Sequence, residues 1–390
     1  MCDAISSRTL SKRDFLRCLG FGVCGAALGS LDWCIAIPSS RARATIRNEG
    51  NEPDKWSKEA LYWEQRDAGI QCLKCPNGCI LGPGETGICR NRVNAKGKLY
   101  SIAYGNPCAV HTDPVEKKPL FHFLPSTRAF SIAAAGCSLR CLNCQNFQIS
   151  QVSPHETQNY DLMPEAVVDQ CIANGCQSIA YTYSEPTSFY EYTLDTAILA
   201  RKRKVRNILK SNGYLNDLPM RNLARHLDAA NIDLKTFDAD AYKRLSQGSL
   251  EPILRALNIL HEEGVWLEIT NLVIPGWTDD PDTIARMCEW LCSNGLSEAP
   301  LHFTRFIPLY RLTQLPTTPV STLENACARA QKAGLKYVYI GNVPGHEAEN
   351  TFCPGCGRII VERRGFVIVQ NSIRDGHCVH CQERIPGVWS

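Results

Sequence analysis

Three cysteines in one short segment have the spacing best suited to chemistry. Cys137, Cys141 and Cys144 follow the pattern Cys-x3-Cys-x2-Cys. Three thiolates can hold three irons of a cubane iron–sulfur cluster, which leaves the fourth iron open to a small molecule. Ferredoxins that only carry electrons usually complete four ligands. The missing fourth cysteine therefore predicts a [4Fe-4S] cluster that takes part in a reaction.

Two further groups of cysteines have spacings typical of metal sites. Eleven of the 21 cysteines lie in the three groups, and gaps of two or three residues favour chelation by a turn over disulfides. The other ten are expected to be small buried hydrophobes. The two further groups are Cys72, Cys75, Cys79 and Cys89, and then Cys353, Cys356, Cys378 and Cys381.

The group near the end of the chain consists of two Cys-x2-Cys knuckles that frame the strand-like residues 358–369. This spacing predicts a zinc-ribbon-like module with structural zinc, and rubredoxin-like iron is an alternative. A nucleic-acid-binding ribbon is disfavoured because the surrounding charge is not strongly basic. The group at 72–89 has three possible occupants: structural zinc, a second iron–sulfur cluster that relays electrons, or no metal. The sequence does not choose between zinc and iron, because thiolates suit both metals.

The composition of the whole chain is that of a soluble globular protein. Of 390 residues, 44% are hydrophobic and 21% are charged, which excludes disordered and fibrous classes. The net charge of +3 is too small to attract a polyanion, so we expect no nucleic-acid partner. The length allows one large domain with one or two small ones.

Short apolar strands alternate with amphipathic helices between residues 131 and 345. This alternation predicts a parallel α/β sheet, either a closed or partly closed (β/α) barrel or an open doubly wound sheet. In both, ligands gather at the C-terminal ends of the strands. The expected strands are 131–135, 178–183, 206–210, 231–235, 266–274, 302–306 and 336–340, and the expected helices are 164–173, 187–203, 218–230, 252–263, 280–293 and 322–333.

Polar residues follow four consecutive strands at the point where each strand ends. The cysteines at 137–144 begin one glycine after the first strand, and Glu185 follows the second. Asn212 follows the third strand, and Asp233 and Lys235 follow the fourth. Each alone has a structural explanation as a helix cap, a turn or a solvated strand end. Their joint placement beside a thiolate group predicts one binding site.

The cysteine motif at 137–144 resembles that of radical S-adenosylmethionine (SAM) enzymes. Their open iron binds SAM, and reduction of the cluster cleaves SAM to a 5′-deoxyadenosyl radical that abstracts a hydrogen from substrate. Residues 72–79, 85–89, 113–125 and 144–146, together with later segments, resemble the radical SAM enzymes of the AmmeMemoRadiSam system. These are relatives of the pyruvate formate-lyase-activating enzyme.

The resemblance implies a partial TIM-type (β/α)6 radical SAM barrel with [4Fe-4S] and SAM as cofactors. It places Glu185 at the SAM amino group, with Asn212, Asp233 and Lys235 around the ribose and carboxylate. One residue departs from the family pattern: the residue before the third cluster cysteine is usually aromatic and packs near the adenine, but here it is Asn143.

Two classes of function compete. The leading hypothesis is a radical SAM enzyme that takes electrons from an external donor and abstracts hydrogen from an unknown small-molecule or protein substrate. A glycyl-radical-enzyme activase is the alternative within the family. A non-catalytic iron–sulfur electron carrier is the alternative outside it, but such a protein would not need polar groups at four successive strand ends.

The first residues have the layout of an export signal. A basic stretch at 11–17, an apolar run at 19–31 and Ala-x-Ala at 42–44 resemble a twin-arginine signal, although Lys12 stands where the first arginine belongs. We expect export, with membrane contact only in transit; the alternative is an uncleaved helix on a cytoplasmic enzyme. The expected organisation is a signal-like segment 1–44, a linker 45–59, an N-terminal Cys-rich module 60–126, the barrel 127–346 and the C-terminal zinc-ribbon-like module 347–390.

Overall fold

A computed structural model of the chain describes residues 53–390. The signal-like segment 1–44 and most of the expected linker therefore lie outside the described residues. Within residues 53–390, no helix has both the length and the apolar character needed to cross a membrane.

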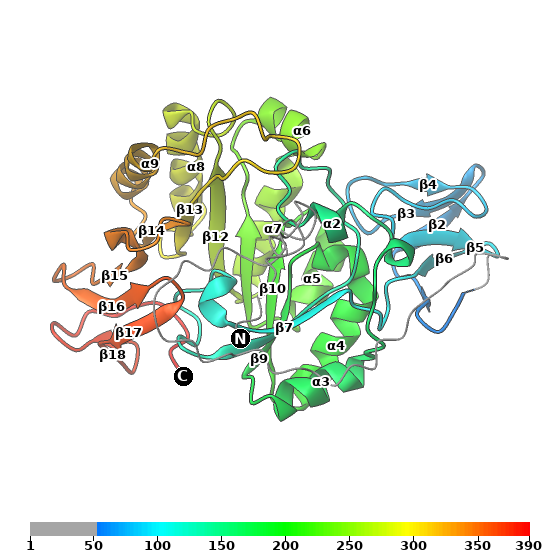
Figure 1. Ribbon diagram of the computed structural model, residues 1–390, viewed down its shortest axis with the longest axis horizontal. Coiled ribbons are helices and arrows are strands. Elements are labelled where there is room, and N and C mark those ends of the chain that lie inside the picture. The colour runs from blue at the N-terminus through cyan, green and yellow to red at the C-terminus, as the bar shows by residue number, and fades with distance from the viewer. Residues whose placement is uncertain (1–52) are drawn as a thin grey trace, which may run out of the picture. The chain divides into compact units, whose positions relative to one another are not determined.

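The centre of the structure is an eight-stranded sheet in the order β14-β13-β12-β11-β10-β9-β8-β7 (Figure 1). Seven of its strands are parallel, and they confirm the seven strands expected from the sequence. The eighth, β7 (Ala109–Pro114), runs antiparallel to β8 at one edge and was not foreseen. The parallel strands are β8 (Arg128–Ala133), β9 (Ser178–Tyr181), β10 (Arg206–Ser211), β11 (Ala229–Asp233), β12 (Trp266–Val273), β13 (Leu301–Arg305) and β14 (Val338–Gly341).

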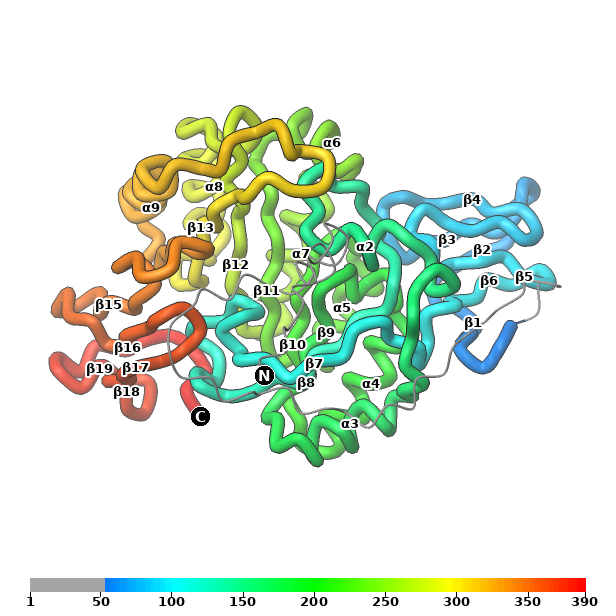
Figure 2. Tube along the Cα trace, viewed as in Figure 1, coloured from blue at the N-terminus to red at the C-terminus, as the bar shows by residue number. Residues whose placement is uncertain are grey.

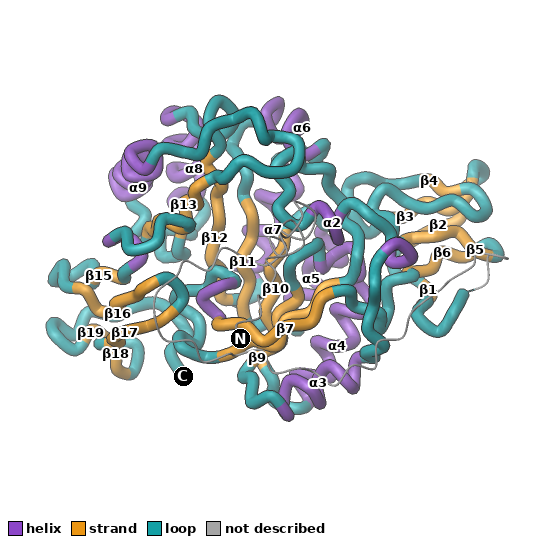
Figure 3. Tube along the Cα trace, viewed as in Figure 1, coloured by secondary structure: helices purple, strands orange, loops and turns teal. Residues whose placement is uncertain are grey.

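The helices lie between successive strands, and all six expected helices are present, although the one expected at 218–230 ends at Ala224 and residues 229–230 begin the next strand. Proline opens α3 and α8, where its missing N–H costs nothing, and the Asp280 carboxylate accepts the Thr283 N–H at the start of α8. Figure 3 shows them beside the strands. The helices are α2 (Phe147–Ser150), α3 (Pro164–Ala173), α4 (Tyr190–Lys202), α5 (Asp217–Ala224), α6 (Ala239–Ser246), α7 (Glu251–Glu262), α8 (Pro281–Ser293) and α9 (Val320–Ala333), with 3-10 turns η1 (Val115–Lys117), η2 (Pro154–Glu156), η3 (Pro186–Phe189) and η4 (Glu347–Glu349).

The strand order decides between the two expected sheet types. Each strand pairs with the next one in the sequence, so the order never reverses as it does in a doubly wound sheet. Six helical connections join the seven parallel strands, and β7 and β14 form the two edges. The fold is therefore a partial TIM-type (β/α)6 barrel, as expected.

Near the N-terminal ends of β12 and β13, a buried carboxylate organises the barrel interior. Glu268 accepts hydrogen bonds from the backbone N–H of Phe121 at 2.9 Å and of His122 at 2.8 Å, and its Oε2 lies 2.7 Å from His302 Nε2. The segment that follows β7 thereby fills this end of the barrel. In barrels of this type ligands bind at the opposite end, where the strands finish.

Two small modules of short strands accompany the barrel, coloured blue and red in Figure 2. The N-terminal one has two three-stranded sheets: β1 (Lys58–Glu59), β6 (Lys98–Ser101) and β5 (Arg92–Ala95), and β2 (Trp63–Arg66), β3 (Gly69–Cys72) and β4 (Ile80–Leu81). The C-terminal one has β15 (Thr351–Phe352), β16 (Ile359–Arg364) and β17 (Val367–Asn371) in one sheet and β18 (Ile373–Arg374) and β19 (His377–Cys378) in another. The C-terminal hairpin is the ribbon-like module expected from the cysteine spacing.

Candidate active site and cysteine centres

The loop that carries the three central cysteines, residues 136–146, is here called the cluster loop. It begins at Gly136, whose φ of +97° is disfavoured for other residues and whose added Cβ would lie 2.4 Å from the Cys89 carbonyl oxygen. The Leu139 N–H donates to Cys137 Sγ at 3.3 Å, and Cys144 Sγ lies 3.0 Å from Ser150 Oγ. The loop therefore already supplies polar partners to two of its sulfur atoms.

Glu185 and Asn212 lie beside the first cysteine of the cluster loop. Glu185 Oε1 accepts hydrogen bonds from Thr187 N–H at 3.0 Å and Ser211 Oγ at 2.7 Å, and Oε2 accepts one from Asn212 N–H at 2.8 Å. Burial raises the pKa of Glu185, although these hydrogen bonds oppose the shift. The Asn212 side-chain amide lies 3.6 Å from Cys137 Sγ. The carboxylate thus joins the ends of β9 and β10 next to the cluster loop.

Asp233 and Lys235 lie on the side of Cys141. Lys235 Nζ is 3.1 Å from Asp233 Oδ2, and Lys210 pairs with Oδ1 of the same carboxylate. Burial alone would raise the pKa of Asp233, but the two ammonium groups hold it well below its usual range. Burial raises the pKa of the Cys141 thiol to about 11, against the Lys235 ammonium, which lowers it. The Lys235 charge therefore acts on the cluster loop.

All the residues that the sequence placed at strand ends are brought to one end of the barrel. Two contributors were missed: Ser211, which donates to Glu185, and Lys210, which pairs with Asp233. Lys210 interrupts the apolar stretch of β10, and that polar residue inside a buried strand was the available signal. Asn143 Oδ1 is buried without a hydrogen-bond partner among residues 53–390. A ligand donor is one way to satisfy that acceptor.

Within residues 53–390, the three sulfur atoms of the cluster loop do not form the close-set group that a single ion needs. In the described part of the chain, only one group of three or more His, Cys, Asp or Glu side chains has all its ligand atoms within 4.8 Å, and it is the C-terminal one. A cubane bonds each thiolate to a different iron, so its thiolates stand farther apart than those around one ion. Three thiolate donors with a nearby cation fit an anionic [4Fe-4S] cluster.

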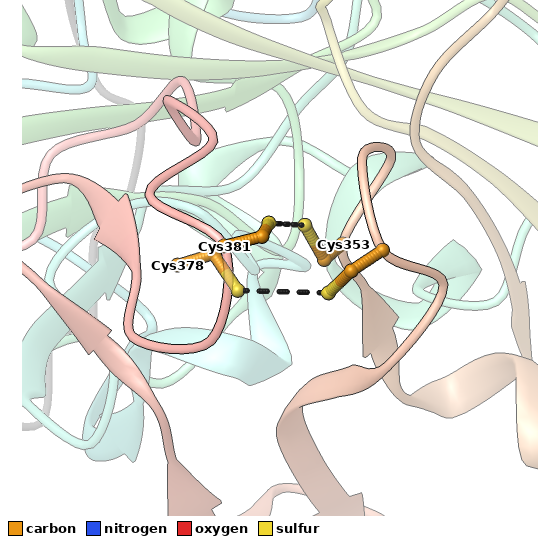
Figure 4. Close-up of side chains that lie close together, drawn as sticks. Cys353, Cys378 and Cys381 are labelled. Atoms are coloured by element: carbon orange, nitrogen blue, oxygen red, sulfur yellow. Dashed lines mark hydrogen bonds between the residues drawn. The ribbon is translucent and has the colours of Figure 1, made fainter.

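Cys353, Cys356, Cys378 and Cys381, the C-terminal cysteine group, have the geometry of a single-ion site (Figure 4). Sγ of Cys353 lies 3.4 Å from that of Cys381, and Sγ of Cys356 lies 3.9 Å from that of Cys378. A tetrahedral zinc with Zn–S bonds of about 2.3 Å places its sulfurs roughly 3.8 Å apart. The site fits zinc, whose presence stays a prediction.

Cys72, Cys75, Cys79 and Cys89, the N-terminal cysteine group, lie in one module. Cys72 ends β3, and its N–H donates to the Cys79 carbonyl at 2.8 Å. Cys89 lies in the turn before β5. Cys72, Cys75 and Cys89 are buried and Cys79 is half-buried.

Comparison with known proteins places the chain in a family. The model of the Radical SAM superfamily matches residues 131–288, which contain the cluster loop and every strand-end residue described above. Uncharacterized protein MJ0808 of Methanocaldococcus jannaschii is 44% identical over 84% of this chain and 98% of its own length. The chain belongs to the radical SAM superfamily.

Two further similarities are more distant. The pyruvate formate-lyase 1-activating enzyme of Escherichia coli K12 is 26% identical over 40% of this chain and 65% of the enzyme. A crystal structure of a domain of the pyruvate-formate lyase-activating enzyme from Bacteroides vulgatus covers 42% of this chain and 99% of that domain, with 17% identity and a TM-score of 0.37. Membership implies a [4Fe-4S] cluster and SAM as cofactors. The assignment to the AmmeMemoRadiSam system stays a prediction.

Proposed function

We propose that this protein is an enzyme that abstracts a hydrogen atom from a small-molecule or protein substrate at the C-terminal ends of its barrel strands. A [4Fe-4S] cluster on Cys137, Cys141 and Cys144 and bound SAM together supply the 5′-deoxyadenosyl radical for this reaction. The convergence of four successive strand ends on one cysteine loop carries the proposal. An electron carrier has no use for that convergence.

The chain's own residues support the thiolates. The Leu139 N–H and the Asn212 amide both reach Cys137 Sγ, and hydrogen bonds of this kind favour the charged form of an acceptor. At the second cysteine, the Lys235 ammonium favours the thiolate of Cys141. These contacts oppose the effect of burial, which favours the neutral thiols.

Glu185 has one acceptor position that no hydrogen bond takes. An ionised carboxylate offers about four acceptor positions, and three are taken by Thr187, Ser211 and Asn212. The remaining position on Oε2 suits the ammonium of SAM. A cation there would also favour the ionised form that burial disfavours.

Four further residues are suited to bind the rest of SAM: Lys210, Asp233, Lys235 and the unpartnered Asn143. Two ammonium groups share one carboxylate, which leaves a net positive charge that suits the SAM carboxylate. The free Asn143 Oδ1 suits an N–H donor such as the adenine amine, in place of the stacking that an aromatic residue would give.

A glycyl-radical activase is the second candidate, and the similarity to the E. coli activating enzyme favours it. The two candidates differ in the substrate, which is a protein glycine for an activase. In both, the electron comes from an external donor.

N-terminal sequencing of the protein from native cells decides between a cleaved export signal and a retained segment on a cytoplasmic enzyme.

The test of the cluster assignment is Cys141→Ala in anaerobically reconstituted protein. The variant should lose about four irons relative to wild type and should lose SAM binding, because two thiolates do not hold the cluster. Cys292→Ala is the matched control, since this half-buried cysteine lies on α8 outside the three groups. Full iron content and SAM binding in Cys141→Ala would contradict the assignment.

A further inference from the structure

The N-terminal cysteine group does not have the geometry of a single-ion site. Its four sulfurs lie in one module, but within residues 53–390 only the C-terminal group has its sulfurs all within 4.8 Å of one another. The spacing of the sulfur atoms therefore differs between the N-terminal and the C-terminal cysteine groups. Wider spacing of four thiolates suits a cubane, in which each cysteine binds its own iron. Four protein ligands also close such a cluster, which is typical of an electron carrier.

A buried ammonium lies beside these cysteines without a partner. Lys74 is fully buried, and its Nζ has no hydrogen-bond partner in the described part of the chain. Lys74 directly precedes Cys75, and it is buried in the same module as Cys72, Cys75 and Cys89. A buried unpaired cation is costly. A metal centre with four thiolates is anionic and would offset that cost.

A second buried cation, Arg92, belongs to the same module. Arg92 pairs with Glu191 at 2.8 Å, and both side chains are 1% exposed. Its Nε has no hydrogen-bond partner among the described residues, and Cys72 and Cys89 act electrostatically on its guanidinium. Lys74 and Arg92 are thus two buried cations in the module of the four thiols, and Glu191 pairs with one of them.

The N-terminal cysteine group lies against the cluster loop. The Cys89 carbonyl oxygen would be 2.4 Å from a Cβ added to Gly136, the residue before Cys137. Asn77 Nδ2 donates to the Ser138 carbonyl at 2.8 Å. Arg140 donates to the Ile88 carbonyl from the cluster loop itself. The two loops that carry these groups of cysteines are therefore in direct contact.

From these observations we propose that the N-terminal cysteine group holds a second [4Fe-4S] cluster, which passes electrons to the cluster at Cys137. This proposal rests on the proposed function for the acceptor. An external low-potential one-electron reductant loses one electron, the N-terminal cluster gains it, and the same electron then moves to the cluster on the cluster loop. No bond forms or breaks, and each transfer oxidises one centre as it reduces the next.

The first test isolates the proposed cluster. A variant with Cys137→Ala, Cys141→Ala and Cys144→Ala should retain about four irons per chain, while wild type holds about eight. Metal analysis and the electron paramagnetic resonance spectrum of the reduced variant measure this. A variant that holds zinc and no iron at this group would overturn the proposal. The iron content is independent of SAM cleavage, so it also separates failure of this proposal from failure of the proposed function.

The charge of Lys74 should affect the midpoint potential of the proposed cluster, which a purely structural role of this residue would not change. In the triple variant, Lys74→Gln should make the midpoint potential of the remaining cluster more negative, because a nearby positive charge favours the reduced, more negative state. Lys98→Gln is the matched control, since its side chain is 53% exposed on β6 of the same module. Equal potentials in the Lys74 and Lys98 variants would contradict a cluster beside Lys74.

The relay itself is tested by the rate of electron entry. In Cys89→Ser, reduction of the cluster at Cys137 by a small one-electron donor protein should slow at least tenfold, measured by stopped-flow absorbance. Cys292→Ser is the control, and both variants are compared after they are shown to bind about four irons at the cluster loop. An unchanged rate in Cys89→Ser would rule out the relay.

Discussion

At the scale of single residues, Glu185 combines a structural role with a binding role. Its carboxylate starts η3 through the Thr187 N–H, as a helix-capping residue does, and it also ties Ser211 and Asn212 to the same place. The sequence could indicate the position after β9 but not these partners, because Ser211 and Asn212 lie 26 and 27 residues away. Capping alone and SAM binding predict different outcomes when the charge is removed.

We expect Glu185→Gln to keep the iron content and weaken SAM binding roughly ten- to hundred-fold. The variant removes a charge-assisted hydrogen bond of about 1.5–3 kcal/mol to the SAM ammonium. Isothermal titration of SAM into the reconstituted protein measures the change. Asp280→Asn is the control, because this carboxylate caps α8 through Thr283 and should not affect SAM. If Glu185→Gln binds SAM with wild-type affinity, Glu185 is only a helix cap.

At the scale of elements, the sequence predicted what is local and missed what depends on distant partners. The parallel strands and their helices were readable because apolar runs alternate with helices bounded by proline and glycine. β7 was missed because its polar half, His111 to Pro114, does not read as a strand; it forms by pairing with β8. The Glu268 network was equally hidden, since its partners Phe121 and His122 lie about 147 residues earlier.

The C-terminal module should be a separate metal-dependent element. Cys356→Ser should release about one zinc per chain and increase hydrogen exchange across residues 351–385, because metal binding to such a module contributes to its folding. The iron at the cluster loop should stay, as the two groups of cysteines occupy different modules. If the variant keeps its zinc, or if it loses the iron together with the zinc, the two sites are not independent zinc and iron sites.

At the scale of the whole molecule, the modules are held to the barrel by buried polar contacts. Arg92 and Glu191 join the N-terminal module to α4. His122 lies in the barrel interior, with Nδ1 2.7 Å from the Pro386 carbonyl and Nε2 2.6 Å from Tyr339 Oη. A carbonyl only accepts, so Nδ1 carries the proton and Nε2 accepts from the tyrosine. None of these pairings follows from sequence spacing.

Protonation of His122 should therefore destabilise the protein. Burial lowers its pKa to about 4, compared with about 6.5 in the unfolded chain. Between these values the unfolded state binds more protons, so stability falls as the pH drops through that window. From pH 7 to pH 5 this histidine should cost about 2 kcal/mol. Urea unfolding should show a smaller loss in His122→Gln, and an equal loss in both proteins would contradict this role.

The central claim is that the barrel cleaves SAM at the cluster loop. The most direct measurement is chromatography of anaerobically reconstituted, reduced protein incubated with SAM. We expect 5′-deoxyadenosine and methionine to form slowly without substrate in wild type, and neither product in Cys141→Ala. Absence of 5′-deoxyadenosine from fully reconstituted and reduced wild type would contradict the account.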